Sequence, residues 1–394
     1  MGGYRNMRKI AVITANRADY SRVKSVLSAI QKRPDLELQL VVAGSHLLDH
    51  YGFTVKEIEK DGFPIAARIP MELHGSDPVS MAKSVGLGVL EFATCFNNLK
   101  PDIVIALVDR YENFASAIAS ATMNIPTAHI QGGEVTGTID ESLRHAMTKL
   151  SHIHFPATSQ AKERIVRMGE DPRYVFDVGC PATDALLDSP EMSTEEMRRE
   201  VRALFKDPQA DFDPSKPYMM VIQHPVTTEY GSGINQAQET LEGIKGLGMQ
   251  IFMLWPNIDA GSGDVSRGIR LFRLANPNEQ FTILGHTPHK LFVNLLRKAK
   301  CLVGNSSSGI RESCYFGLPT VNIGTRQKGR EHGKNVIHAG YSKNEIRQAV
   351  LKQLEHGNYP TESIYGNGDA GEKIAKILAE TKLPSVQKRL YEGS

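Results

Sequence analysis

The sequence alternates short apolar runs rich in β-branched residues with stretches of helical spacing, and this alternation restricts the fold more than any other feature. It is typical of βαβ units, in which helices cover both faces of a parallel sheet. Several runs are apolar throughout, as strands buried on both faces must be. The sequence therefore predicts an α/β protein with Rossmann-like, doubly wound sheets.

The candidate strands fall into two series separated by a polar stretch. The first series is expected at 10–14, 38–43, 103–108, 127–130, 153–155 and 174–178, and the second at 218–222, 251–255, 281–284, 301–303 and 320–323. We predict an N-terminal domain at 1–187, a linker region at 188–217 with one helix at 194–205, a C-terminal domain at 218–380 and a tail at 381–394. Because ligands of open α/β sheets bind beyond the carboxyl ends of the strands, a cleft between two such domains is expected.

Composition excludes several classes of partner. The 394 residues are 41% hydrophobic and 23% charged, with a formal net charge of +2. This balance argues against nucleic-acid or membrane-surface binding, which usually needs a concentrated basic face. We expect no apolar stretch near the roughly 20 residues that span a bilayer, no signal peptide, and a cytoplasmic location. The spacing of four cysteines and thirteen histidines predicts neither disulfides nor a metal site.

The most distinctive motif is Gly-Asn-Ser-Ser-Ser-Gly-Ile-Arg-Glu at 304–312, directly after the apolar run 301–303. Small hydroxyl residues at a predicted helix start leave backbone N–H groups unpaired at the positive end of the helix dipole, which suits a phosphate. Glu312, in the first predicted turn, could accept hydrogen bonds from a ribose. The alternative is an ordinary Ser-rich helix cap.

Other polar residues follow predicted strands. Arg17, in the first βα turn, could bind a pyrophosphate bidentately, or could be a surface residue beside a helix-capping Asp19. Asp109 could be a base or a substrate anchor, or simply a helix cap paired with Arg110. His224 could donate to a phosphate or protonate a leaving group.

The segment 132–145 carries the most chemistry. Its Gly-Gly-Glu start is expected to bring the backbone close to a ligand and to present Glu134 toward the cleft. Thr138 and Glu141 have the spacing of a capping box, so a helix should begin there. Asp140 then falls one turn before Arg144 on the same helix face. Two carboxylates on one short loop can hold separate protonation states, which acid–base catalysis requires.

These motifs also occur together in the order of a known family. They are N-R-A-D-Y at 16–20, D-R at 109–110, G-G-E-V-T-G-T-I-D at 132–140, R-H at 144–145, Q-H-P-V-T-T at 223–228, P-N-I-D at 256–259, G-N-S-S at 304–307 and G-T-R-Q at 324–327. In this combination, from about residue 8 to 379, the chain resembles the hydrolysing UDP-N-acetylglucosamine 2-epimerases of sialic-acid synthesis.

The resemblance implies a glycosyltransferase-B-like pair of domains that binds a UDP-sugar between them, without a cofactor or a metal. It implies removal of the C2 proton of the GlcNAc unit while UDP departs, giving 2-acetamidoglucal. Water then adds at C1 and a proton returns to the opposite face of C2, which yields N-acetylmannosamine. The resemblance also implies a homodimer or homotetramer.

The resemblance further implies roles for individual side chains. The catalytic set is Asp109, Glu134, Asp140 and His224, and which carboxylate takes the C2 proton stays open. The substrate- and UDP-binding set is Arg17, Asp19, Ser21, Arg110, Arg144, His145, Asn257, His286, Thr287, Ser306, Ser307, Glu312 and Arg326.

Two positions depart from the family pattern. Val108 stands where many relatives have Gly, and Gln131 where many have Glu. Both leave the sugar open, so a UDP-2,4-diacetamido-trideoxy sugar and GDP-linked GlcNAc stay alternative substrates. The alternative functions are a non-hydrolysing 2-epimerase, a retaining glycosyltransferase and a UDP-sugar-binding regulator without catalysis.

Overall fold

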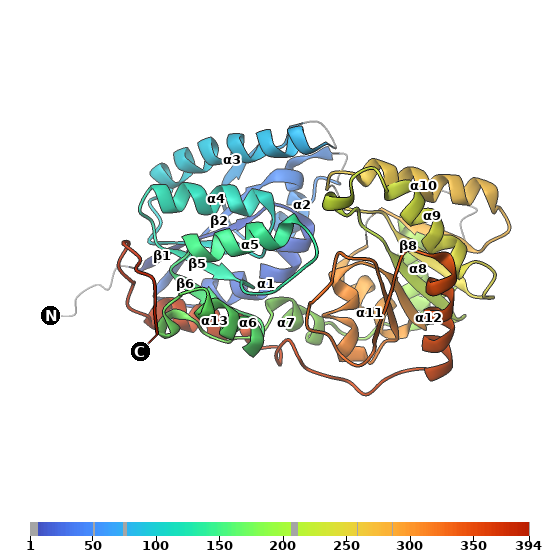
Figure 1. The fold of residues 1–394 in the computed structure, drawn as a ribbon. Helices are drawn as coiled ribbons and strands as arrows, with labels where there is room; N and C mark the ends of the chain where they lie inside the picture. The colour runs from blue at the N-terminus through green and yellow to red at the C-terminus, as the bar shows by residue number, and fades with distance from the viewer. Residues whose placement is uncertain are drawn as a thin grey trace. The chain divides into compact units, whose positions relative to one another are not determined.

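The computed structural model describes residues 7–49, 52–73, 77–205, 212–257, 259–285 and 287–393. The chain divides into two compact units, shown in Figure 1 and described here one at a time. Unit 1 comprises Met1–Glu134, Asp140–Asp188 and Tyr365–Ser394. Unit 2 comprises Val135–Ile139 and Ser189–Ile364.

Unit 1 is built on a six-stranded parallel sheet with the strand order β3-β2-β1-β4-β5-β6. Its strands are β1 (Arg8–Thr14), β2 (Leu36–Ala43), β3 (Ile65–Ile69), β4 (Ile103–Leu107), β5 (Thr127–Ile130) and β6 (Ile153–Phe155). Its helices are α1 (Arg17–Gln31), α2 (Val55–Lys60), α3 (Pro78–Leu99), α4 (Tyr111–Thr122), α5 (Ile139–Leu150), α6 (Ser159–Arg167), α7 (Pro181–Leu187) and α13 (Ala370–Glu380).

Successive side chains of the central strand β1 pack into two different hydrophobic cores. Ile10 and Val12 are fully buried in the core that includes α1 and α13. Ala11 and Ile13 are buried on the opposite face, in the core that includes α3 and α4. Since successive side chains of a strand point to opposite faces, a strand covered on both sides must be apolar throughout.

Unit 2 repeats this architecture with the strand order β12-β11-β10-β7-β8-β9, again parallel throughout. Its strands are β7 (Tyr218–Ile222), β8 (Gln250–Leu254), β9 (Phe281–Leu284), β10 (Cys301–Gly304), β11 (Thr320–Ile323) and β12 (Val336–Ala339). Its helices are α8 (Thr194–Leu204), α9 (Gly233–Ile244), α10 (Ser262–Ala275), α11 (His289–Lys298) and α12 (Lys343–His356). Helices α9, α10 and α12 cover one face of the sheet, and α8 and α11 the other.

The predicted fold class is confirmed, and the differences lie at sheet edges. The edge strands β3 and β12 were not predicted, because an edge strand is only partly covered and lacks a continuous apolar run. The segment 174–178, predicted as a strand, contributes only an isolated bridge from Val175 to His154 beside β6.

The units are divided differently from the expected domains. Residues 365–394, including α13, belong to unit 1, where Ile374 and Leu378 are fully buried. The expected linker belongs largely to unit 2, because Met197 and Val201 of α8 are fully buried in its core.

Helix α3 corrects the expectation that no apolar stretch approaches the length of a membrane span. Its 22 residues are long and apolar enough to cross a bilayer by length and composition. The helix packs Phe92 and Phe96 into the core of unit 1, however, and is a layer of that unit. A soluble core helix passes the same length and composition test.

Candidate active site

The end of β4 is held in a strained backbone conformation that positions Asp109. Val108 has φ 54°, a left-handed conformation that is unfavourable for a β-branched residue. Its N–H donates to Ile130 O at 3.0 Å, and its carbonyl accepts from Nε2 of the buried His129 at 2.8 Å. Burial lowers the pKa of His129 to about 3, so the ring is neutral and keeps this single donor. Both polar backbone groups of Val108 are therefore fixed immediately before Asp109.

Arg144 connects Asp109 with the backbone of Glu134. Its guanidinium is fully buried, donates through Nη2 to the carboxylate of Asp109, and donates through Nη1 to Glu134 O at 2.7 Å. Arg144 lies on α5, which begins at Ile139 as predicted, with Asp140 in its first turn. Although Asp140 lies one turn before Arg144, the guanidinium of Arg144 bonds the end of β4, which a buried guanidinium can reach across the fold.

The paired glycines before Glu134 lie close to protein atoms of their own unit. A Cβ at Gly132 would lie 2.8 Å from Nδ1 of His129. A Cβ at Gly133, which has φ 77°, would lie 2.4 Å from Ala161 O. The glycines therefore let the turn after β5 pack against its own unit, and Glu134 is buried beside them.

The first βα turn contains a buried carboxylate. Asn16, rather than Asp19, caps α1, since its Oδ1 accepts from the backbone N–H of Asp19 at 3.0 Å. The Asp19 carboxylate accepts from the side-chain amides of Asn16 at 3.0 Å and Asn113 at 3.1 Å, while its buried Oδ1 has no hydrogen-bond partner among the residues that the structure describes. Burial and the nearby Glu112 carboxylate raise the pKa of Asp19 to about 7.

Two other predicted residues, Arg17 and Ser21, lie on α1, and a third, Arg110, directly precedes α4. Arg17 is the first residue of α1, and burial lowers its pKa. The hydroxyl of Ser21 donates to Ala18 O at 2.9 Å, within its own helix. Arg110 forms a bidentate ion pair with the buried Glu112, at 2.9 and 3.2 Å.

His145 lies one residue after Arg144 on α5. Its Nε2 is 3.7 Å from a carboxylate oxygen of Glu141, one turn earlier. Its Nδ1 is buried and finds no hydrogen-bond partner in the described part of the chain, and burial lowers the pKa of the ring. His145 therefore has one ring nitrogen still able to bond a ligand.

In unit 2 the site is organised around His224, which follows β7. The side-chain amide of Asn305 accepts from the backbone N–H of His224 at 2.7 Å and donates to its carbonyl at 2.9 Å. Nδ1 of His224 accepts from the backbone N–H of Asn257 at 3.1 Å. In the neutral ring the proton then lies on Nε2, so this nitrogen is a hydrogen-bond donor.

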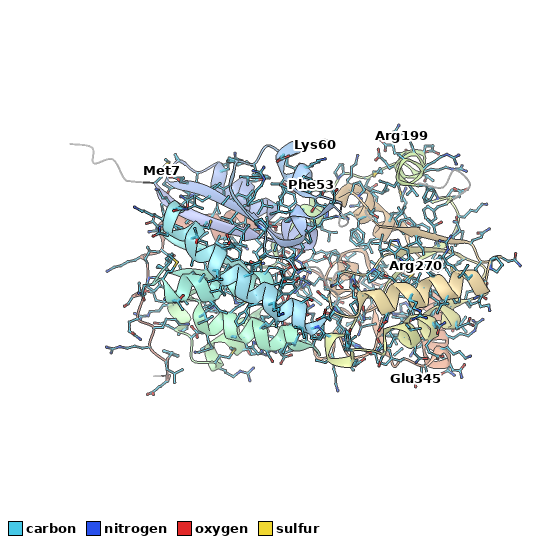
Figure 2. All side chains as sticks on the ribbon, turned by 90° about the horizontal axis from the view of Figure 1, so that it is seen from above. Met7, Phe53, Lys60, Arg199, Arg270 and Glu345 are labelled. Carbon is cyan, nitrogen blue, oxygen red and sulfur yellow. The ribbon has the colours of Figure 1, made fainter. Side chains whose placement is uncertain are left out.

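Several buried polar side-chain atoms of unit 2 have no hydrogen-bond partner within the described part of the chain, and four of them belong to the sequence motifs described above. Since buried polar atoms are normally paired, each of these four is a candidate partner for a polar ligand. They are Gln223 Nε2, Thr227 Oγ1, Asn257 Oδ1 and Glu312 Oε2. Asn257 lies two residues after Trp255, and the guanidinium of Arg270 lies over the Trp255 ring, 5.2 Å from its centroid. Arg270 belongs to α10 and is labelled in Figure 2.

The prediction of a helix after residue 304 is wrong. The chain forms two short 3₁₀ turns instead, Ser307–Gly309 and Ser313–Phe316, so no long helix dipole points at Ser306 and Ser307. The Ser313 hydroxyl donates to Gly309 O at 2.7 Å, which satisfies a carbonyl that a helix would have used. The turn ends at Gly317, where φ is 56° and a Cβ would clash with Tyr359 O. This close approach leaves room for only a short turn.

The loop after β11, residues 324–331, is rich in basic residues and is held by hydrogen bonds within unit 2. The Thr325 hydroxyl and the Tyr341 hydroxyl both donate to the carboxylate of Glu229, the latter at 2.6 Å. Nη1 of Arg326 donates to Asn305 O at 3.2 Å, as does Nε2 of Gln327 at 3.0 Å. Arg326 is thereby tied to the same asparagine that holds His224.

Two residues after β9, His286 and Thr287, were predicted to bind the substrate. Thr287 is fully buried in unit 2, directly before α11. His286 lies outside the described residues. Among the residues described, no group of three or more His, Cys, Asp and Glu side chains is arranged to hold a metal ion.

Sequence reasoning assigned no role to three residues that organise these sites: Asn305, Asn113 and Glu229. In the sequence, Asn305 stood out only as part of the motif 304–312, which was predicted to bind a phosphate. Asn113 links Asp19 to the N–H of Leu107, and the one sequence signal was a buried-looking Glu-Asn pair opening an otherwise apolar helix. Two partners of Glu229, Thr325 and Tyr341, lie about a hundred residues away, so no local pattern could indicate them.

The two doubly wound units, each with polar side chains beyond the carboxyl ends of its strands, define an α/β protein of the glycosyltransferase-B-like class. The chain is similar in fold to a UDP-GlcNAc 2-epimerase from Neisseria meningitidis crystallised with UDP-GlcNAc, with a TM-score of 0.77, 18% identity, and coverage of 95% of this chain and 100% of that one. A UDP-GlcNAc 2-epimerase from Methanocaldococcus jannaschii in complex with UDP-GlcNAc and UDP gives a TM-score of 0.75, 18% identity, and coverage of 95% and 100%.

Sequence comparison identifies the family. The UDP-N-acetylglucosamine 2-epimerase family matches residues 28–379. A UDP-N,N'-diacetylbacillosamine 2-epimerase (hydrolyzing) of Legionella pneumophila is 36% identical over 379 residues, 96% of this chain and 97% of that protein. A UDP-N-acetylglucosamine 2-epimerase of Neisseria meningitidis serogroup B is 32% identical over 391 residues, 98% of this chain and 99% of that protein. The chain belongs to the UDP-N-acetylglucosamine 2-epimerase family and is an enzyme of that family.

Proposed function

We propose that this enzyme is a hydrolysing UDP-GlcNAc 2-epimerase that converts UDP-GlcNAc and water to N-acetylmannosamine and UDP. The observation that carries the proposal is the buried arrangement of Arg144 with Asp109 and the backbone of Glu134. It fixes two carboxylate-bearing residues at the carboxyl ends of adjacent strands, where such sheets bind ligands.

The proposed chemistry begins with an elimination. A carboxylate from the set Asp109, Glu134 and Asp140 removes the C2 proton while the C1–O bond breaks and its electron pair leaves with UDP. Water then adds at C1 of the resulting 2-acetamidoglucal, and a proton is delivered to the opposite face of C2. Two carboxylates in different surroundings suit this reaction, because one must accept a proton and another must donate one.

Unit 2 supplies the groups proposed to bind UDP. Nε2 of His224 is a donor and can stabilise the negative charge that develops on the departing diphosphate. Ser306, Ser307 and Arg326 are proposed to contact the same diphosphate. Glu312 Oε2, which has no hydrogen-bond partner among the described residues, is an acceptor suited to a ribose hydroxyl.

The hydrolysing reaction is favoured over epimerisation with retention of UDP by the names of the relatives. Two proteins at 36% and 31% identity carry "hydrolyzing" in their names, from Legionella pneumophila and Campylobacter jejuni. Relatives named only UDP-N-acetylglucosamine 2-epimerase include those from Escherichia coli K12 and Bacillus subtilis, at 21% and 24% identity, and the one from Neisseria meningitidis, at 32%.

An NMR experiment in D2O tests the proposal. Purified protein and UDP-GlcNAc should give free UDP and N-acetylmannosamine with deuterium at C2, because the returning proton comes from solvent. Formation of UDP-N-acetylmannosamine would show the non-hydrolysing reaction instead. Product without deuterium at C2 would contradict the elimination.

The second candidate substrate is UDP-2,4-diacetamido-2,4,6-trideoxyglucose, and one observation favours it. The Legionella relative at 36% identity is named for the diacetylbacillosamine sugar. The same NMR assay with both sugars, compared by kcat/KM, decides between them. A higher kcat/KM for the diacetamido sugar would reassign the substrate and leave the reaction type unchanged.

A further inference from the structure

The C-terminal segment, residues 381–393, follows α13 and runs along unit 1, where Leu383 packs against the hydrophobic core. Leu390 is 64% exposed and Val386 is 40% exposed. The segment is held mainly by polar bonds: Nε2 of His152 bonds Val386 O at 3.1 Å, and the Tyr391 N–H donates to Gly169 O at 2.9 Å. Beyond Leu383, polar contacts therefore hold the segment in place.

Lys388 is the strongest of these anchors. Its ammonium donates to Lys149 O at 2.8 Å and to Ser151 O, and lies 3.4 Å from Thr148 O. These carbonyls belong to the last turn of α5 and the residue just beyond it, where a helix leaves its carbonyls unpaired. A cation at a helix C-terminus is also favoured by the helix dipole. Lys388 thus caps α5 from a segment more than two hundred residues away in sequence.

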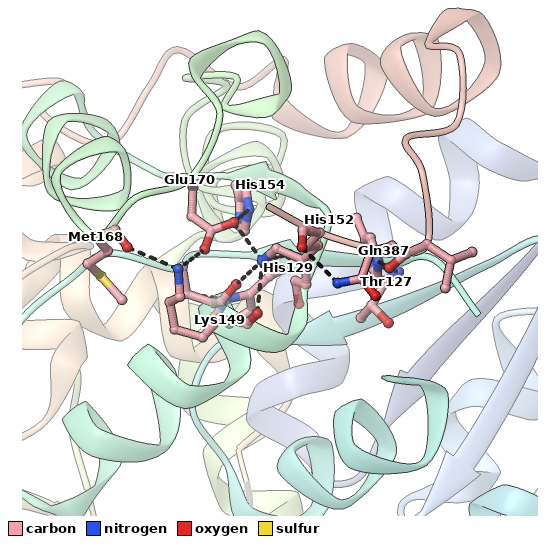
Figure 3. Close-up of polar contacts among 12 residues, drawn as sticks. Thr127, His129, Lys149, His152, His154, Met168, Glu170 and Gln387 are labelled. Carbon is pink, nitrogen blue, oxygen red and sulfur yellow. Dashed lines mark hydrogen bonds and ion pairs between the residues drawn. The ribbon is translucent and has the colours of Figure 1, made fainter. Parts of the chain in front are cut away.

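A buried carboxylate strengthens the cap. Oε2 of Glu170 lies 2.6 Å from Nζ of Lys388 and 3.0 Å from Nε2 of His154, and Oε1 accepts from Lys149 at 2.7 Å (Figure 3). The bond from Lys149, in the last turn of α5, thereby links Glu170 to the C-terminal end of this helix (Figure 3). Because Glu170 is only 2% exposed, it depends on these cations for its charge.

The opposite half of α5 carries residues of the candidate site. Asp140 lies in its first turn, and Arg144 donates from its middle to Asp109 and to Glu134 O. Thr148, one turn after Arg144, donates to Arg144 O at 3.0 Å and is the residue whose own carbonyl faces Lys388. A displacement of the last turn of α5 would be passed along this rigid helix to Arg144.

We infer that Lys388 is a positioning residue for the reaction: by capping α5 from the C-terminal segment, it holds Arg144 where Arg144 aligns Asp109. The inference rests on the proposed function. Lys388 touches neither Asp109 nor Asp140 in the bonds described above, so it acts through the helix. Its loss should therefore slow the chemical step more than it weakens substrate binding.

The test compares Lys388→Met, which keeps the length of the side chain but removes the charge, with Lys388→Arg and Arg389→Ala. Arg389 is the exposed cation next to Lys388 and serves as the matched control. Amide hydrogen exchange of ligand-free protein reports on α5, and steady-state kinetics with UDP-GlcNAc reports on turnover. Thermal unfolding of each variant confirms that the protein remains folded.

For Lys388→Met we expect exchange in the last two turns of α5 to accelerate about tenfold and kcat to fall about tenfold, with KM changed by less than about twofold. Lys388→Arg should keep the exchange rate of α5 and kcat close to their wild-type values, and Arg389→Ala should alter neither.

Unchanged exchange in α5 would overturn the inference, whether or not activity falls. A loss of activity that appears wholly in KM would also overturn it. Exchange is measured without substrate, so absence of UDP-GlcNAc turnover in the wild-type protein would contradict the proposed function while the exchange data still decide whether Lys388 caps α5.

Discussion

The side-chain amide of Asn305 bonds both polar backbone atoms of His224, accepting from its N–H at 2.7 Å and donating to its carbonyl at 2.9 Å. Asn305 follows β10 and His224 follows β7, and these strands are neighbours in the sheet of unit 2. The backbone of Asn305 in turn accepts from Arg326 and Gln327. One asparagine therefore sets the relative position of two loops proposed to bind the diphosphate.

Asn305→Ala should weaken UDP binding about as much as His224→Ala does, by roughly tenfold to a hundredfold. The physical reason is that alanine leaves two backbone groups of His224 unpaired, each costing about 1–3 kcal/mol if buried. Isothermal titration with UDP measures the effect. Unchanged UDP affinity in Asn305→Ala, with weakened affinity in His224→Ala, would show that the backbone clamp is dispensable.

Asp109→Asn and Glu134→Gln should each fold normally and lower kcat by at least about a thousandfold, because an amide of the same shape cannot take up or deliver the C2 proton. The measurements are release of UDP and exchange of the C2 proton in D2O. Asp102→Asn, an exposed substitution near the start of β4, is the control. A rate like that of the wild-type protein in either variant would remove that residue from the mechanism.

Asp19→Asn should stabilise the protein increasingly as the pH rises. The pKa of Asp19 is raised to about 7, mainly by burial, so the folded state holds the proton more tightly than the unfolded chain. Its favourable contribution is fully present below the ordinary pKa of an aspartate and is lost as the pH rises toward 7. Asparagine does not ionise, so the variant should gain up to about 4 kcal/mol relative to the wild-type protein between pH 4 and 8.

Urea unfolding at several pH values across that window measures this difference. Parallel stability curves for the wild-type protein and Asp19→Asn would mean that Asp19 ionises normally in the folded state.

Glu170→Gln should destabilise the protein at neutral pH and have little effect in strong acid. Burial opposes the charge of Glu170, but bonds from His154, Lys149 and Lys388 outweigh burial and lower its pKa to about 2. A lowered carboxyl pKa adds stability that is present above the ordinary glutamate value and is lost as the pH falls toward 2. The difference at pH 7 should be at most about 3 kcal/mol.

Denaturant unfolding between pH 3 and pH 7 measures this effect, and Glu91→Gln, an exposed change on α3, is the control. A destabilisation by Glu170→Gln that does not shrink as the pH falls would show that the lowered pKa is not its source.

Much of the fold could be predicted because central strands carry a local signature. The runs at β5 and β7 were predicted with their observed bounds, since strands buried on both faces must be continuously apolar. The edge strands β3 and β12 carry no such run and were missed. The predicted helix after residue 304 failed because Gly317 approaches Tyr359 closely, a contact that no local pattern reveals.

The sequence by itself determined the α/β class, the parallel strands and the placing of polar residues directly after them, because alternation of apolar runs and turn chemistry act over a few residues. Only the tertiary structure decided that Arg144 bonds Asp109 rather than Asp140, that Asn305 holds His224, and that Lys388 returns to cap α5. Each of these bonds joins residues between 35 and 239 positions apart. Buried polar groups must find partners wherever the packed chain brings them, so their pairing follows from the complete fold and not from spacing along the sequence.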